Sequence, residues 1–526
     1  MADISGGNRP ELADAGRLAR KLVGRAVRMA RTEDQPLRQV LLDHLGPEAA
    51  RLPTISGSYP LWEHVNLQVG VESWLAASPD RTHELIGITG VGQLRFNDLS
   101  IGALVQARPG GQYGAAAVSA AITTALPCGP GGQTRGCVSN GIYLVRDGED
   151  RLALMLLPSG IGPQQEVTLQ VVGADQGHVE RVLAEVRRLA VERSVFRGQV
   201  ISFGPELFGM AGASTPLNFL SRPSVRRDQV VLPDELLDQI EGQVLGIARH
   251  AGRLLASGQH LKRGILLYGA PGAGKTHTVN YLLGRLPQAT VIVISGRALG
   301  RITEACSVAR TLQPSVVVVE DVDLIAEERN HHPGEHPLLF QLLNEMEGLN
   351  SATDVTFLLT TNRADLLEPA LADRPGRVDL AAELPLPDAS ARRALIRLYQ
   401  GSLVLDDTGV DAVVARTDGV TAAFLRELLR KAALLAAEAD AAEAKADAAA
   451  ADADAAEADA AGAAGAAGAE ADAAGAKADA AGADGDSSSP IRVADGQLEA
   501  ALDQLLAGRS ELTRVLLGGQ AASAAG

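Results

Sequence analysis

Gly269-Ala-Pro-Gly-Ala-Gly-Lys275-Thr276 decides the fold of the second half of this 526-residue chain. The apolar residues 265–268 precede this stretch, and residues 276–286 follow it with the apolar spacing of a helix. A strand, a glycine-rich loop and a helix in this order are the context that a phosphate-binding P-loop requires. The glycines let successive backbone N–H groups turn toward phosphate oxygens, and the helix start adds positive potential. We therefore predict a phosphate site formed by Gly269, Ala270, Pro271, Gly272, Ala273, Gly274, Lys275, Thr276 and His277.

Two side chains of this loop add chemistry of their own. Lys275 is placed to reach the β and γ phosphates of a nucleoside triphosphate, and the Thr276 hydroxyl is placed to bind Mg²⁺. The alternative is an ordinary glycine-rich turn without a ligand. The full motif stands in register with its strand and its helix, and this favours the phosphate site.

A second apolar strand is predicted at residues 316–319, which are four valines followed by Glu320-Asp321-Val322-Asp323. A strand of this kind suits the interior of a parallel sheet, and ligands bind at the carboxyl ends of such strands. We predict that Glu320 belongs to the Mg²⁺ shell and that Asp321 orients or deprotonates the attacking water. Acids at a strand end often cap a helix instead, and we expect Asp323 to be such a cap.

A third strand is predicted at residues 355–359 and leads to Asn362, whose amide is placed to hold the water or the γ phosphate. Farther along, Arg374 and Arg377 supply two guanidinium groups, the chemistry of an arginine finger. The alternative for both arginines is local pairing with Asp373 and Asp379.

The length of the chain and its changes of pattern predict several domains, because 526 residues are too many for one core. We assign residues 1–218 to a separate N-terminal α+β domain, since short apolar runs broken by Gly and Pro precede a helical stretch there. Residues 10–45 have helical spacing. Residues 219–386 are assigned to an α/β P-loop NTPase core, a parallel sheet with flanking helices.

An acidic, alanine-rich segment interrupts the C-terminal region at residues 437–489. Its first half could prolong a helix, because Ala, Glu and Lys favour one, but the glycines from Gly462 onward oppose a continuous rod. The side chains are too small and too charged for a core, so we predict a disordered insertion. Residues 498–506 then regain helical spacing.

Composition limits the classes of partner and the compartment. The net charge of −16 lies largely in the acidic insertion, and three scattered cysteines make no disulfide framework and no zinc motif. Arginines at residues 17–31 could meet nucleic acid or an acidic partner, but we interpret them as a solvated helix face. Without a leader pattern or an apolar run of about 18 residues, we expect a cytoplasmic protein that does not bind membranes.

Four stretches together resemble the AAA ATPase core. They are R-G-I-L-L-Y-G-A-P-G-A-G-K-T at 263–276, V-V-V-V-E-D-V-D-L-I at 316–325, L-L-F-Q-L-L-N-E-M-E-G-L at 338–349, and T-T-N-R-A-D-L-L-E-P-A-L-A-D-R-P-G-R-V-D at 360–379. The likeness extends more loosely through G-V-T-A-A-F-L-R-E-L-L-R-K-A-A at 419–433, which looks like the family's helical lid. We therefore assign residues 387–517 to a lid that contains the insertion and residues 518–526 to a tail.

This resemblance implies ATP and Mg²⁺ as ligands, with Lys275, Thr276, Glu320, Asp321 and Asn362 in the roles given above. It also implies that Arg374 and Arg377 act on the ATP of a neighbouring subunit in a homo-oligomeric ring, usually a hexamer. The implied function is remodelling or disassembly of an unknown protein target, and a nucleic-acid target is not expected. The alternative is a nucleotide-dependent scaffold that hydrolyses ATP slowly.

The chain departs from the family pattern at two places. The acidic pair is Glu320 then Asp321, where the family usually has Asp then Glu, and the shorter water-activating side chain is expected to slow hydrolysis. Residues 295–314 are short and lack the aromatic-hydrophobic-glycine triplet that grips a threaded polypeptide. We still expect the stretch from Arg297 to Arg301 to line the pore.

Overall fold

The computed structural model describes residues 36–91, 99–108, 110–111, 113–159, 166–203, 217–323, 338–348, 352–363, 365, 378–463 and 490–507. The chain divides into two compact units. One comprises Met1–Arg222, Pro287–Val318 and Thr353–Val355, and the other Pro223–Leu286, Val319–Ala352 and Thr356–Gly526. Of the helix predicted over residues 10–45, only α2 (Leu37–Leu45) lies within the described residues.

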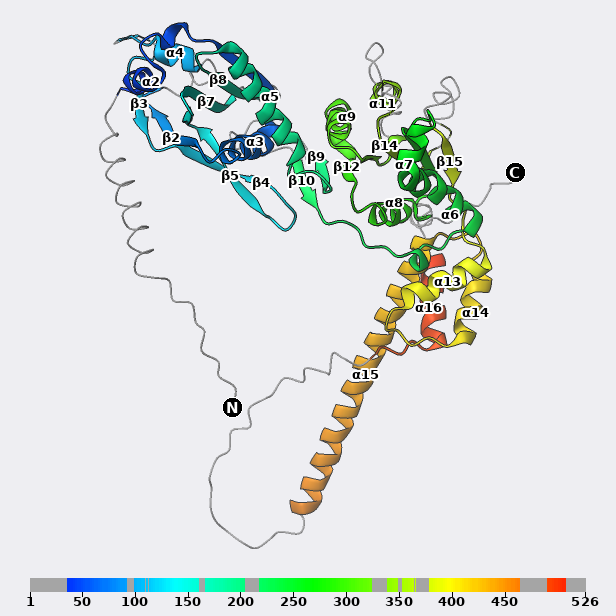
Figure 1. Cartoon of the computed structure of the whole chain (residues 1–526). Coiled ribbons are helices and arrows are strands. Elements are labelled where there is room, and N and C mark those ends of the chain that lie inside the picture. Colours follow the sequence, from blue (N-terminus) through cyan, green and yellow to red (C-terminus); the bar gives the residue numbers. More distant parts are fainter. Residues whose placement is uncertain are drawn as a thin grey trace, which may run out of the picture. The chain divides into compact units, whose positions relative to one another are not determined.

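The N-terminal domain is a six-stranded antiparallel sheet between two helical layers (Figure 1). The strands have the order β1-β8-β7-β6-β2-β3 and the bounds β1 (Thr54–Pro60), β2 (Arg81–Thr89), β3 (Ala117–Ser119), β6 (Ile142–Asp147), β7 (Asp150–Ser159) and β8 (Glu166–Val172). Helices α2 and α4 (Ile101–Val105) cover one face, and α3 (His64–Ala76) and α5 (Gln176–Glu192) cover the other. Alternate residues of β7 therefore serve two cores: Met155 packs on one face, and Leu154 and Leu156 pack on the other.

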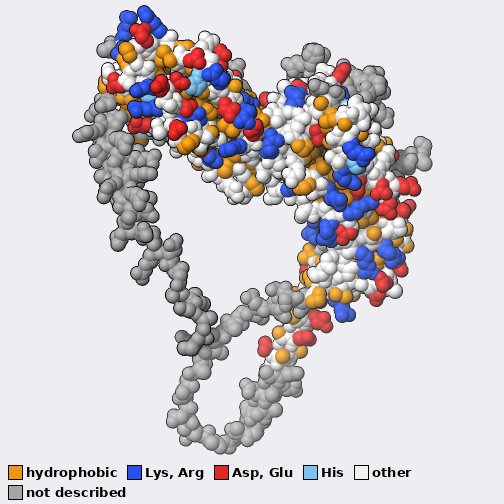
Figure 2. Space-filling model, in the orientation of Figure 1, with side chains coloured by type: hydrophobic (Ala, Val, Ile, Leu, Met, Phe, Trp, Pro, Cys, Tyr) orange, Lys and Arg blue, Asp and Glu red, His pale blue; other side chains and the backbone are white. Residues whose placement is uncertain are grey.

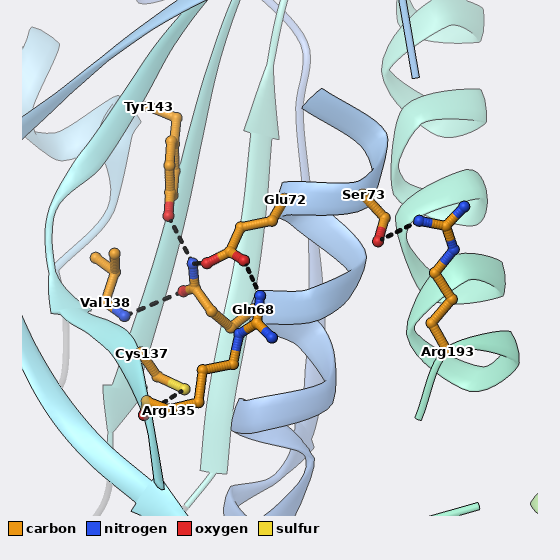
Figure 3. Close-up of polar contacts among 8 residues, drawn as sticks. All are labelled: Gln68, Glu72, Ser73, Arg135, Cys137, Val138, Tyr143 and Arg193. Carbon is orange, nitrogen blue, oxygen red and sulfur yellow. Dashed lines mark hydrogen bonds and ion pairs between the residues drawn. The ribbon is translucent and has the colours of Figure 1, made fainter. Parts of the chain in front are cut away.

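A hairpin of β4 (Ile122–Pro127) and β5 (Thr134–Asn140) is anchored to α3 by polar side chains. In Figure 3 the Gln68 amide accepts from the Val138 N–H at 3.0 Å and donates to the Tyr143 hydroxyl at 2.9 Å. Glu72 pairs with Arg135 beside it. Because these contacts use both ends of the Gln68 amide, the buried polar groups of α3 are satisfied and the hairpin is fixed in register.

A second sheet has seven strands in the order β10-β9-β12-β13-β14-β11-β15. Their bounds are β9 (Val200–Phe203), β10 (Leu217–Leu220), β11 (Arg263–Tyr268), β12 (Thr290–Ile294), β13 (Ser315–Val319), β14 (Val355–Thr361) and β15 (Leu380–Glu383). Strand β11 pairs in parallel with β14 and β15, and β12 pairs in parallel with β9. Every residue of β13 and β14 is buried, as expected for central strands of a parallel sheet.

The boundary predicted at residue 218 falls within β10, and β9 precedes it. Strand β9 nevertheless pairs in parallel with β12, and β10 pairs with β9. A four-residue stretch such as Val200–Phe203 resembles the strands before it, and nothing in its local pattern specifies which sheet it joins.

Short helices follow the strands of this sheet. They are α6 (Asp234–Glu241), a π-helical turn η6 (Gly242–Gly246), α7 (Ile247–Ala256), α8 (Lys275–Gly284), a 3₁₀ turn η7 (Gly296–Arg301), α9 (Ile302–Thr311) and α11 (Leu338–Glu347). Helix α8 begins directly after the glycine-rich loop, so the P-loop residues lie between β11 and α8.

The C-terminal part is a helical bundle of α13 (Ala389–Gln400), α14 (Asp407–Arg416), α15 (Ala422–Ala463) and α16 (Asp495–Leu506). Leu425, Leu428 and Leu502 are fully buried in its core. The predicted helix at residues 498–506 lies within α16, which packs against α14 and α15.

The predicted disorder of the insertion is wrong for residues 437–463, which continue α15 beyond the bundle (Figure 1). Residues 437–453 are exposed, so this part of the helix has no core. Its backbone hydrogen bonds are internal and its alanines lose little side-chain entropy on becoming helical. Residues 464–489 lie outside the described part of the chain.

The described helices and the visible surface bear on two expected absences, a membrane and a nucleic-acid partner. No helix among the described residues is long and apolar enough to span a membrane. On the face drawn in Figure 2, Lys and Arg side chains of the N-terminal domain are interspersed with Asp and Glu. That face has the mixed character of an ordinary solvated surface and no extended basic stripe of the kind that tracks a phosphate backbone.

Candidate functional site

The glycine-rich loop is shaped by two close approaches of the backbone. Gly269 has φ +145°, and a Cβ there would lie 2.5 Å from the Leu384 carbonyl oxygen. Gly272 has φ +81°, and a Cβ there would lie 2.7 Å from the Ala423 Cβ. The Gly272 carbonyl also accepts from the Ala423 N–H at 3.2 Å. The loop therefore requires glycine at these positions, and its tip contacts the first turn of α15.

The Lys275 ammonium is held over the loop by three acceptors. It donates to the carbonyls of Gly269 at 2.8 Å and Ala270 at 3.0 Å, and to Oδ1 of Asn362 at 2.8 Å. Burial lowers the pKa of Lys275, and the nearby carboxylates of Asp321 and Asp323 oppose that shift. A partly desolvated ammonium at the start of α8, beside the phosphate loop, is suited to pair with a phosphate oxygen.

The Thr276 hydroxyl lies near enough to Glu320 to lower the pKa of its carboxyl, so the two predicted Mg²⁺ ligands lie close together. Burial raises the pKa of Glu320, the charge of Asp321 raises it further, and the Thr276 hydroxyl opposes the shift. A hydroxyl and a carboxylate next to the phosphate loop are the hard oxygen ligands that Mg²⁺ prefers. The residues present therefore fit a magnesium ion.

Asp321 and Asn362 complete the same cluster. Asn362 Nδ2 donates to Asp321 Oδ1 at 3.3 Å while its oxygen accepts from Lys275, so one amide links the two charged groups. Asp321 has φ +52°, in the left-handed region that Asp and Asn tolerate better than most residues. The turn after β13 thereby presents the carboxylate at the edge where β14 presents Asn362.

Asp323 has a role beside that of the predicted helix cap, whose helix extends outside the described residues. Its Oδ1 accepts from the Thr361 hydroxyl at 2.8 Å and from the Asn362 N–H at 3.3 Å. The Asp321 N–H in turn donates to the Thr360 hydroxyl at 3.2 Å. The ends of β13 and β14 are therefore fixed to each other, which the sequence could not indicate because its two threonines read as ordinary strand residues.

The remaining predicted site residues are placed as follows. Pro271 and Gly272 are exposed in the loop, Ala273 is buried, and Gly274 adopts φ +106° just before α8. The exposed His277 ring contacts the Gln229 carbonyl at 2.9 Å and has no contact with the acidic pair among the described residues. Arg374 and Arg377 lie outside the described part of the chain.

Sequence reasoning missed Thr421 and Ala423, the bundle residues that pack on Gly272. No spacing rule connects them to a loop so far away in the chain.

Metal-binding and thiol chemistry elsewhere in the described residues is limited. No group of three or more His, Cys, Asp or Glu side chains in the described residues is arranged to hold a metal ion. Cys137 is fully buried, and burial raises the pKa of its thiol to about 12, so it is not a reactive thiolate.

Replacing Gly272 with alanine tests the contact between the loop and α15. The added Cβ meets Ala423 and must adopt a left-handed φ, so we expect a loss of about 1–3 kcal/mol of stability and weaker nucleotide binding. Gly252→Ala is the matched control, because a Cβ there meets nothing within 4 Å on α7. It should be neutral or stabilise by up to about 1 kcal/mol. Thermal melts and nucleotide titrations measure both, and equal behaviour of the two variants would contradict the contact.

Replacing Glu320 with glutamine tests the origin of its raised pKa. Because the folded chain disfavours the ionised carboxyl, Glu320 lowers stability at neutral pH, and this cost disappears as pH falls through the raised pKa toward 4.5. We expect Glu320→Gln to melt at a higher temperature than the unaltered chain at pH 7. The difference should shrink on acidification. Glu438→Gln, at an exposed position of α15, should show no such pH-dependent difference.

Part of the chain is similar to known proteins. Residues 265–386 match the family model "ATPase family associated with various cellular activities (AAA)". The ATP-dependent zinc metalloprotease FtsH 3 of Sphaerobacter thermophilus is 32% identical over 237 residues, covering 43% of this chain and 48% of that protein. The ATPase family gene 2 protein homolog A of Homo sapiens is 34% identical over 206 residues, covering 36% of this chain and 23% of that protein. The chain spans less than half the length of these relatives.

Proposed function

Residues 265–386 form a domain of the AAA ATPase family, and from this premise we propose that the chain hydrolyses ATP in a homo-oligomeric ring to remodel or disassemble a protein target. One observation carries the proposal. The Lys275 ammonium, the Asn362 amide and the Asp321 carboxylate form one hydrogen-bonded series at the ends of neighbouring strands, with the Thr276–Glu320 pair in the same site. This is the set of groups that binding and hydrolysis of a triphosphate require.

Each side chain has a separate task in this proposal. Lys275 exchanges its carbonyl and amide acceptors for β and γ phosphate oxygens. Thr276 and Glu320 would hold Mg²⁺, which neutralises charge on the phosphates when bound. Asp321 accepts a proton from the attacking water or orients it. Asn362 stays hydrogen-bonded to Asp321 and aligns the water with the γ phosphate.

We assign the C-terminal bundle to the lid. The support is the contact of Gly272 with the start of α15, which joins the phosphate loop directly to the bundle. A change in the loop upon nucleotide binding or loss is therefore transmitted to the bundle through Thr421 and Ala423. The exposed extension of α15 beyond the bundle is a solvated helix in this assignment.

We place Arg374 and Arg377 against the ATP of a neighbouring subunit, in a ring that is expected to be a hexamer. Arg374→Ala should keep ATP affinity and lose about 10³-fold or more in turnover, the usual effect of removing an arginine finger. Mixing it with Lys275→Ala subunits, whose arginines are intact, should restore part of the turnover. Steady-state ATPase assays on the mixtures measure this. Turnover of Arg374→Ala at the unaltered rate would contradict the assignment.

We assign target selection to the N-terminal domain, in the cytoplasm and without nucleic acid or membrane as a partner. The mixed charge on its visible face supports a protein target. The stretch from Arg297 to Arg301 would line the pore, and the short 295–314 segment without aromatic paddles favours disassembly or gating over threading.

The alternative is a scaffold whose assembly follows nucleotide while turnover stays minor, and the order Glu320 then Asp321 favours it. ATP hydrolysis per subunit, measured with sizing chromatography over a range of chain concentrations, separates the two. A rate that rises as the ring assembles supports the enzyme. Negligible turnover in the assembled ring would leave only the scaffold.

A further inference from the structure

The segment that leaves the N-terminal domain is fixed at its first turn. After α5 ends, the Val195 N–H donates to Asn66 Oδ1 at 3.0 Å. The Phe196 ring, 2% exposed, lies between two aromatic rings, with centroids 6.1 Å from Trp62 and 5.7 Å from Phe219. A buried aromatic series and a satisfied backbone N–H are the opposite of a flexible interdomain linker.

The next residues are tied to the stretch that surrounds α9. Arg197 donates through Nη1 to the Gln313 carbonyl at 3.1 Å and through Nη2 to the Val191 carbonyl at 3.2 Å. One guanidinium thus joins the end of α5 to the end of α9. The Gly198 N–H donates to the Thr290 hydroxyl at 3.1 Å, just where β12 begins.

Backbone pairing continues the connection without a break. The Val291 N–H donates to the Gln199 carbonyl at 2.8 Å, and β9 then runs parallel to β12. Arg222 Nη2 donates to the carbonyls of Gly198 at 3.0 Å and Ala289 at 2.8 Å. The segment is therefore held to β12 on both sides of β9 and β10.

Helix α9 also packs directly on the N-terminal domain. The two enclose a small cavity of about 10 Å³, which has room for about one water molecule. Its walls include Glu63 and Asn66 near the start of α3, Ala190 and Val191 at the end of α5, and Val308 and Thr311 of α9. The Glu63 carboxylate, itself buried, pairs with Arg187 at 3.1 Å and fixes α5 to this wall.

We propose that the N-terminal domain, β12, η7 and α9 move as one rigid body, so that binding at the N-terminal domain is passed to η7 without a hinge. η7 runs from Gly296 to Arg301 between β12 and α9, and it contains the two arginines assigned to the pore. A partner that reorients the N-terminal domain therefore reorients these residues as well. The rigid connection goes beyond the proposed ATPase activity and does not depend on it.

Distances between spin labels test the connection in the full-length chain. Labels are placed on Glu180→Cys of α5 and Ser307→Cys of α9, both exposed positions, with Cys128→Ser to remove the most accessible native thiol. Labelled chains are diluted with unlabelled ones, so that distances between subunits do not contribute. The distance distribution should be no wider than that of a control pair within the N-terminal domain, Glu180→Cys with Asp43→Cys. It should not shift on adding ADP or a non-hydrolysable ATP analogue.

Removing the side-chain contacts that hold the segment after α5 should broaden the distance distribution. Asn66→Ala combined with Arg197→Ala should broaden the α5–α9 distribution and leave the control pair unchanged. If that chain does not fold, Arg197→Ala alone serves, because its side chain is exposed and its removal leaves no cavity. A broad or nucleotide-dependent distribution in the unaltered chain overturns the rigid body, and so does an interface variant that stays as narrow as the control. These distance measurements require no ATP turnover. Failure of the rigid-body proposal can therefore be told apart from failure of the ATPase proposal.

Discussion

Lys275→Ala weakens ATP binding at least about 30-fold, because the substitution removes the only ammonium that contacts both the loop and Asn362 in the described structure. Truncating one partner of a buried, hydrogen-bonded charge pair costs about 2–5 kcal/mol, and 2 kcal/mol corresponds to about 30-fold in the dissociation constant. Burial lowers the pKa of Lys275 and so disfavours its charged form in the free chain, whereas a bound phosphate would favour that form. Isothermal titration with ATP and Mg²⁺ measures the change.

Lys262→Ala is the control for this prediction. It removes a side chain of the same type, one residue before β11. This position is partly exposed and has no contact to the loop among the described residues. Its affinity should match that of the unaltered chain. The melting temperatures of both variants show whether either change has unfolded the domain. Equal ATP affinity of Lys275→Ala and Lys262→Ala in folded chains would remove the basis for the phosphate site.

The core of the nucleotide domain could be predicted because its local patterns are strong. The valine run of β13 and the glycine-rich loop each specify an element and its partner chemistry within a few residues. The resemblance then placed Lys275, Asp321 and Asn362 at one edge, and the structure brings them into one hydrogen-bonded group. The match of residues 265–386 to the AAA family model agrees with that resemblance.

Contacts between segments far apart in the sequence could not be predicted from such local patterns. Strands β9 and β10 join the second sheet through β12, whose Val291 pairs with Val200, 91 residues earlier in the chain (291 − 200). Asp323 fixes the end of β14, and this contact could not be predicted because Thr361 lies beside it only after the sheet has formed. The sequence left open that the first half of the insertion prolongs a helix, and the predicted disorder rested on side chains too small and too charged for a core. Helix α15 continues to Ala463 without a core, because alanine-rich segments can be helical without one.

Asp321→Asn retains ATP binding and lowers hydrolysis about 10²–10⁴-fold, the usual contribution of a general base. The amide has the shape of the carboxylate but cannot take a proton from water. Asn also tolerates the left-handed backbone at φ +52° as well as Asp does, so the turn after β13 should keep its geometry. The variant should therefore collect in the ATP-bound state, and any ring that depends on ATP should become longer-lived.

Single-turnover hydrolysis, with ATP affinity measured in parallel, separates this chemical loss from a binding loss. Asp365→Asn is the matched control, since Asp365 is exposed and pairs with Arg363 outside the cluster. It should hydrolyse ATP at the unaltered rate. Asp321→Glu keeps a carboxylate that can take a proton from water, and it restores the family's residue type. Glu is less suited than Asp to a left-handed φ. Turnover should therefore fall, but less than in Asp321→Asn. If Asp321→Asn hydrolyses ATP at the unaltered rate, the base must be another group, and Glu320, the neighbouring carboxylate with a raised pKa, becomes the next residue to replace.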